Sequence, residues 1–340
     1  MSLDRRTVNA LLAGLPLAGA LPGAQAQQRK NSVVLGMILE PTGLDPTTAS
    51  AAAIGEVVHY NIFEGLTKIG MDGAVTPLLA ENWTESPDGK SYTFRLRRGV
   101  TFSDGAPFDS AAVKFSFDRA KAEGSTNKAK KAVFDNIASV TAYDPNTVIL
   151  TLNNADATMP FRLGENTAVI LHPNSAAGAA TKPIGTGPFR LETWNKGSSI
   201  VLTRSPNYRD ATKVRLDRVT FRFINDPAAQ VSALLAGDID GMPRFGAFQA
   251  LKQFQGDKRF TVEVGSTAGK GILALNNRKK PFDDVRVRRA LTHAIDRKAF
   301  IEGAQEGLGK PIGSHFAPTD LGYVDLTGMY PYDPSARRRC

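Results

Sequence analysis

Short stretches of this chain alternate between hydrophobic and polar residues, which is the pattern of strands that bury one face. In the clearest of them, residues 92–97, the inward side chains are expected to be Tyr92, Phe94 and Leu96. Further strands are expected where apolar and β-branched residues cluster, at 32–37, 147–152, 189–192, 200–203 and 219–224. Helical patterns lie between these strands, so the sequence indicates an α/β protein.

The helical patterns are apolar residues that recur every three or four positions, preceded in several places by a capping residue. The expected helices are 51–64, the segment after Asp109 or Ser110, an exposed lysine-rich segment around 128–138, 229–235, and the segment after Asp283 or Asp284. Three of them have an apolar face that predicts burial. The residues on these faces are Ile54, Val57, Val58 and Ile62, then Val113, Phe115 and Phe117, and finally Val287, Ala290, Leu291 and Ile295.

The first residues have the features of an export signal rather than of a folded segment. Arg5 and Arg6 precede an apolar run over 10–21, and Ala24-Gln25-Ala26 is a small-x-small cleavage site. The run is short and interrupted by glycine and proline, so a membrane span is not expected. We predict a signal peptide over 1–26 and an exported protein, with the Sec and Tat routes both open.

Charge and cysteine content narrow the function classes. The formal net charge is +9, but the basic residues are dispersed rather than gathered on one stripe, so a nucleic-acid partner is not expected. The only cysteine is Cys340, which excludes an intrachain disulfide.

No motif for catalysis or for a metal is present. The four histidines, His59, His172, His293 and His315, lie in separate segments without ligand spacing. The serines fill no nucleophile elbow, and the glycine-rich stretch near 185 lacks a phosphate-binding continuation. We therefore expect no enzyme activity, no cofactor and no metal site.

Three stretches resemble solute-binding protein family 5, the periplasmic dipeptide, oligopeptide and nickel receptors of ABC importers. Residues 80–119 nearly fill the family pattern that begins W-x-x-S-x-D-G and ends F-S-F, although Ser110-Ala111-Ala112 lacks the usual aspartate. Residues 183–189 read P-I-G-T-G-P-F, and Gly185 and Gly187 are expected to adopt backbone conformations that a β-carbon forbids. Residues 276–297 match the stretch N-x-x-x-P-F-D-D-V-R-V-R that continues to A-I-D-R.

The resemblance implies an α/β fold of the periplasmic-binding-protein-like type II class, with an incomplete second lobe. Lobe I is expected to be discontinuous, over 27–66 and 174–265, with an inserted α/β subdomain at 67–173. Residues 266–340 would then begin lobe II. Family members continue beyond the Y-D-P pattern near residue 332 into most of that lobe, so a C-terminal truncation is expected.

The resemblance also implies the role of a substrate-binding subunit, which captures peptides in the periplasm and delivers them unchanged to ABC permease subunits. We expect a monomer. The residues expected to line the ligand cleft are Ala49, Ser50, Ala52, Ala53, Met242, Pro243, Arg244, Phe245, Gly269 and Lys270. Two alternatives stay open: a receptor for a nickel chelate, a sugar or an opine, and a truncated remnant without function.

Overall fold

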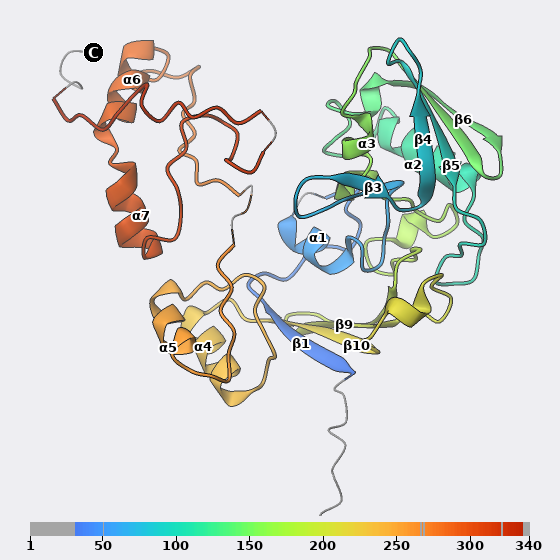
Figure 1. Ribbon diagram of the computed structural model, residues 1–340, viewed down its shortest axis with the longest axis horizontal. Coiled ribbons are helices and arrows are strands. Elements are labelled where there is room, and N and C mark those ends of the chain that lie inside the picture. Colours follow the sequence, from blue (N-terminus) through green and yellow to red (C-terminus); the bar gives the residue numbers. More distant parts are fainter. Residues whose placement is uncertain (1–30, 50, 266, 268, 321, 336–340) are drawn as a thin grey trace, which may run out of the picture.

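A computed structural model describes residues 31–49, 51–265, 267, 269–320 and 322–335 of the chain. The predicted signal peptide, residues 1–26, lies outside them. The described strands form two four-stranded sheets and one small two-stranded sheet, and helices cover the larger sheets (Figure 1). None of the described helices combines the length and the apolar composition needed to cross a membrane.

The first sheet joins the start of the chain to its middle. Its strand order is β1-β10-β9-β8, and β1 runs parallel to β10. The strands are β1 (Ser32–Met37), β8 (Phe189–Asn195), β9 (Ser199–Arg204) and β10 (Arg218–Phe223). They confirm the four strands that the sequence predicts here, to within a few residues. Apolar side chains of this sheet pack against helix α1 (Ala52–Val58), and we call this cluster the β1 core.

The second large sheet is antiparallel, with the order β4-β5-β7-β6. Its strands are β4 (Ala80–Glu85), β5 (Ser91–Leu96), β6 (Ile137–Asp144) and β7 (Thr147–Leu152). Tyr92, Phe94 and Leu96 are buried, as their alternation predicts. Helix α2 (Ser110–Lys121) packs on β6 and β7, and Val113 and Phe117 complete a second cluster, the β5 core.

Helix α2 begins where the sequence predicts and lies between the two cores. Its cap is Asp109 rather than Ser110, since the Asp109 carboxylate accepts hydrogen bonds from the backbone of Ala111 at 2.9 Å and Ala112 at 3.2 Å. Phe115 is only half-buried and packs against the β1 core. The helix therefore contacts both halves of the fold.

Further strands and α-helices complete the described fold. They are β2 (Thr67–Ile69), β3 (Val75–Pro77), α3 (Met159–Arg162), α4 (Pro227–Ala236), α5 (Leu251–Gln255), α6 (Val285–Ala294) and α7 (Arg297–Gln305). Helices α4 and α5 lie beside β1 in Figure 1 and form a third apolar cluster, which includes Leu234, Ile239 and Phe254.

Two predicted helices are wrong in extent or in kind. The helix expected over 51–64 ends at Val58, because Tyr60 adopts a φ of 59° and its N–H bonds the carbonyl of Phe63 in a turn. The segment 128–138 forms turns and a short 3-10 helix, Phe134–Asn136, instead of an α-helix. Strand β6 already begins at Ile137, where pairing with Leu152 of β7 replaces a helical conformation.

Gly185 and Gly187 are needed for space rather than for unusual backbone angles, so the predicted reason is wrong. Neither residue has a positive φ. A β-carbon on Gly185 would lie 2.0 Å from the carbonyl oxygen of Ile62, and one on Gly187 would lie 2.4 Å from that of Asn61. Here the chain passes so close to the turn after α1 that only glycine fits.

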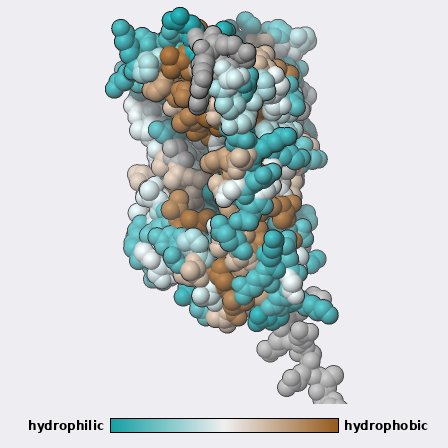
Figure 2. All heavy atoms as spheres, turned by 90° about the vertical axis from the view of Figure 1, so that its left-hand side faces the viewer, coloured by the Kyte–Doolittle hydropathy of each residue, from teal (hydrophilic) through white to brown (hydrophobic). Residues whose placement is uncertain are grey.

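Helix α6 begins at the predicted cap, but its predicted burial is wrong. The Asp284 carboxylate accepts the N–H of Arg286 at 2.8 Å. None of Val287, Ala290, Leu291 and Ile295 is buried, since no sheet covers this helix in the described part of the chain. Beyond Phe254, Ala317 is the one described hydrophobic residue that is buried. Figure 2 shows hydrophobic residues scattered among hydrophilic ones on the side that faces left in Figure 1.

Candidate functional site

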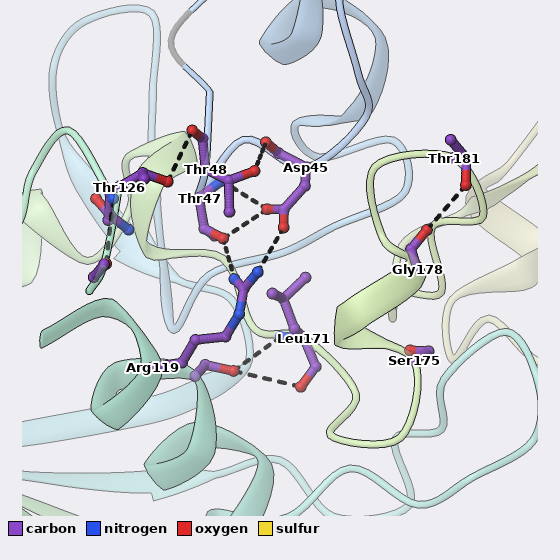
Figure 3. A network of polar contacts seen from close by, with 12 residues as sticks. Asp45, Thr47, Thr48, Arg119, Thr126, Leu171, Ser175, Gly178 and Thr181 are labelled. Carbon is purple, nitrogen blue, oxygen red and sulfur yellow. Dashed lines mark hydrogen bonds and ion pairs between the residues drawn. The ribbon is translucent and has the colours of Figure 1, made fainter. Parts of the chain in front are cut away.

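The loop that follows β1 is held in one conformation by a buried carboxylate. Asp45 is 3% exposed and accepts hydrogen bonds from the backbone N–H of Thr47 at 2.9 Å and its hydroxyl at 2.6 Å. Arg119 of α2 donates to the other Asp45 oxygen at 2.9 Å and also to the Thr47 hydroxyl. Figure 3 shows these three side chains pointing at one another. The loop is thereby fixed to α2.

This anchored loop leads directly into the first predicted ligand segment. Ala49 is half-buried and packs against the β1 core, Ala52 is exposed at the first position of α1, and Ala53 is buried. Ser50 lies outside the described residues. The hydroxyl of Thr126 donates to the carbonyl of Thr48 at 3.1 Å, so a loop beyond α2 also supports the segment (Figure 3).

The second predicted segment, 242–245, lies against the same helix. Arg244 donates to the Glu56 carboxylate of α1 at 2.6 Å. Phe245 packs edge-on against Phe254, with ring centroids 5.5 Å apart, and Met242 joins the same apolar cluster, while Pro243 is exposed. The pair of Arg244 with Glu56 thus joins the segment 242–245 to α1, the helix that contains Ala52 and Ala53.

The third predicted segment lies elsewhere. Lys270 pairs with Asp320 at 3.4 Å, and the N–H of Gly269 bonds the Thr267 hydroxyl. The N–H of Ala317 and then Lys270 hold the pKa of Asp320 below its usual value. Within the described residues, no hydrogen bond or ion pair joins Gly269 or Lys270 to the other two segments.

A hollow of about 480 Å³ adjoins the first segment, and the sequence reasoning did not find it. It lies where α1 ends, and its walls come from three separate parts of the chain. Its lining includes His59, Ile69, Lys128, Val133, Arg162, Glu165, Asn166 and Thr167. In the sequence, the charged residues Lys128, Arg162 and Glu165 resemble ordinary surface residues. No local pattern could therefore have shown that they line one hollow.

Burial changes the pKa values of two side chains that line this hollow, His59 and Glu165. It lowers the pKa of His59 to about 4, although the Gly164 carbonyl accepts a hydrogen bond from the His59 Nε2 atom at 3.1 Å. The imidazole is therefore neutral at neutral pH. Burial also raises the pKa of the Glu165 carboxyl, and the nearby Arg162 only partly opposes this. Neither here nor elsewhere among the described residues do three His, Cys, Asp or Glu side chains gather as a metal site would require.

Comparisons of this chain with a family model and with curated proteins point to the same family. The family described as bacterial extracellular solute-binding proteins, family 5 Middle, matches residues 74–339. The glutathione-binding protein GsiB of Salmonella choleraesuis is 30% identical over 331 residues, which cover 96% of this chain and 64% of the relative. GsiB of Escherichia coli K12 is 30% identical over 339 residues, with the same coverage. The chain therefore spans less than two thirds of the length of these relatives.

Solved structures agree with this match. The binding protein AgaA of A. tumefaciens R10, in complex with agropinic acid, superimposes with a TM-score of 0.80 at 29% identity. DppA of Helicobacter pylori, in complex with the peptide STSA, superimposes with a TM-score of 0.79 at 28% identity. Each match covers 91% of this chain, and it covers 63% of AgaA and 65% of DppA. The fold is thus the predicted periplasmic-binding-protein-like α/β fold.

Proposed function

Because the chain belongs to family 5 of the bacterial extracellular solute-binding proteins, we propose that it captures a small solute for an ABC importer. The match over residues 74–339 is the observation that carries this proposal. In this role the protein is exported to the periplasm, binds its solute as a monomer without changing it chemically, and delivers it to permease subunits of the inner membrane.

The proposed solute is a peptide or a compound of similar size. Among the similar proteins, GsiB is a glutathione-binding protein and the H. pylori structure holds a peptide, which supports this class. An opine is the second candidate, because the similar structure AgaA holds agropinic acid. All ten residues predicted to line the cleft remain part of the proposal, with α1 and the segment 242–245 at its centre.

The proposed division into lobes follows the two large cores. Residues 27–66 and 174–265 form lobe I around the β1 core, which combines α1 with strands β8 to β10. The subdomain 67–173 contains almost all of the β5 core, and residues 266–340 begin lobe II. Ligand capture in such a fold takes place between lobes, where closure removes water from the solute.

Isothermal titration calorimetry tests the proposal with glutathione, a dipeptide, the peptide STSA and agropinic acid. We expect saturable binding of at least one, with the bound solute recovered unchanged by mass spectrometry. Binding of none, or recovery of a cleaved solute, would reject the proposal.

Two matched variants locate the site. Arg244→Gln breaks the ion pair with Glu56 beside α1 and is expected to weaken binding several-fold. Arg259→Gln breaks a comparable exposed pair with Asp257, outside the predicted segments, and is expected to leave binding unchanged. Equal effects of the two variants would place the solute elsewhere.

A further inference from the structure

The hollow at the end of α1 lies beside the segment proposed to meet the solute. Asn127 donates from its side chain to the carbonyl of Thr167 at 2.9 Å, and Thr126 bonds Thr48 at 3.1 Å. A β-carbon on Gly55 would lie 2.9 Å from the Asn166 side-chain nitrogen. These contacts place the walls of the hollow next to both the loop before α1 and the helix itself.

One wall of the hollow holds a guanidinium whose Nε–H group makes no hydrogen bond with the described residues. The Arg162 side chain is half-buried, its Nε atom is covered by the protein and makes no hydrogen bond, and its charge interacts with the nearby Glu165 carboxylate. A covered N–H group without an acceptor is costly, and each such group in a native structure calls for an explanation, such as a water, an ion or a functional role. The terminal nitrogens of this half-buried side chain make no hydrogen bond within the described residues, so they can meet an acceptor that a ligand supplies.

The charge of the hollow favours an anion. Lys128 lines it with no ion-pair partner among the described residues, so two cations face the single carboxylate of Glu165. His59 adds no charge at neutral pH because burial lowers its pKa to about 4. Burial raises the pKa of the Glu165 carboxyl, and the charge of Arg162 opposes this rise.

We propose that this hollow is a recognition subsite for a carboxylate group of the captured solute, with Arg162 and Lys128 as the binding cations. The subsite rests on the proposed function and narrows it to solutes that bear an acidic group. A guanidinium holds a carboxylate through charge-assisted hydrogen bonds of defined geometry, which Lys128 supplements as a point charge. The apolar residues Ile69, Ala129 and Val133 line the same hollow and fit the alkyl part of such a group.

Side-chain nuclear magnetic resonance tests the subsite on the purified chain, with glutarate as the carboxylate probe and glutaramide as its uncharged counterpart. The Arg162 Nε–H signal is assigned by its loss in Arg162→Gln. We expect this signal to shift saturably with glutarate and to stay in place with glutaramide.

Two lysine variants test whether glutarate binds to Lys128 itself or only to the general positive charge of this loop. Lys128→Gln, at an exposed position that tolerates change, is expected to weaken glutarate binding about tenfold, as loss of one charge-assisted contact does. Lys131→Gln is the matched control, because Lys131 is an exposed lysine of the same loop that does not line the hollow. It is expected to leave glutarate binding unchanged.

The outcomes distinguish this subsite from the importer function. Absence of an Arg162 shift at glutarate concentrations on the order of 10 mM, or equal shifts with glutaramide, overturns the subsite whether or not a solute is captured. Equal weakening by Lys128→Gln and Lys131→Gln also overturns it. A saturable Arg162 shift in a chain that binds none of the calorimetry solutes keeps the subsite and rejects the importer function.

Discussion

The buried ion pair between Glu64 and Arg209 gives the sharpest stability prediction. Glu64 is 2% exposed, and its carboxylate accepts hydrogen bonds from both terminal nitrogens of Arg209, at 2.7 and 2.8 Å, and from Thr186 at 2.9 Å. Burial alone would lower the pKa of Arg209, but the hydrogen bonds and charge of Glu64 outweigh it, so the pKa is raised. The pair thus joins the turn after α1 to two distant loops.

Arg209→Met removes the counter-charge and leaves the Glu64 carboxylate buried with only the Thr186 hydroxyl. Removing one partner of a buried ion pair costs roughly 3–5 kcal/mol of unfolding free energy. Because Thr186 still donates to the carboxylate, we expect a value near the lower end, about 3 kcal/mol. The double variant Glu64→Gln with Arg209→Met carries no buried charge at this site. Its unfolding free energy should therefore fall by less than that of Arg209→Met alone.

Urea unfolding at neutral pH measures these losses, with tryptophan fluorescence and far-ultraviolet circular dichroism as probes. Trp83 packs against the β5 core and Trp194 against the β1 core, so fluorescence reports on both. Arg218→Met is the control, because its pair with Glu192 is largely exposed and should contribute at most about 1 kcal/mol. A loss for Arg209→Met no larger than that of Arg218→Met would refute the reasoning.

Three further predictions follow from single contacts. Gly185→Ala places a β-carbon against the Ile62 carbonyl and should cost at least about 3 kcal/mol in urea unfolding, while Gly178→Ala, which meets open space, should cost less than about 1 kcal/mol. Burial lowers the pKa of His59 to about 4 from its ordinary value of 6.5, so the unfolded state binds the extra proton and stability falls as pH drops from 6.5 to 4. His59→Gln should reduce that fall by about 2–3 kcal/mol, and identical pH profiles would contradict this. Asp45→Asn weakens the anchor to Arg119 and should accelerate hydrogen exchange over 46–53, and unchanged exchange there would count against it.

Local patterns predicted strands β1, β5 and β7 to β10, because a strand with one buried face needs only alternation, but they did not predict β2, β3, β4 or β6. Tyr92 and Phe94 are buried for this reason, and Asp109 caps α2 because a short carboxylate reaches the first free N–H groups. The same local logic failed at 128–138, where pairing of Ile137 with Leu152 forms a strand. The partner, Leu152, is too far along the chain for a local hydrophobic pattern around Ile137 to reveal the pairing.

The candidate site could be predicted only in part. The segments 49–53 and 242–245 were chosen through family resemblance, and the pair of Arg244 with Glu56 brings them to one helix. Nothing in the sequence associated Arg162 with Lys128, because the association requires α3 and the loop after α2 to meet at the end of α1.

The amino-acid sequence by itself determined the family, the α/β class and the inward faces of the main strands, since these depend on motifs and on local geometry. The tertiary structure alone decided that Ser32 pairs with Arg218, that α1 ends at Val58, and that Gly185 passes against Ile62. Each of these depends on contacts between residues far apart in the chain. Such contacts form only when the intervening segments fold and close, and local periodicity does not encode which partner will be met.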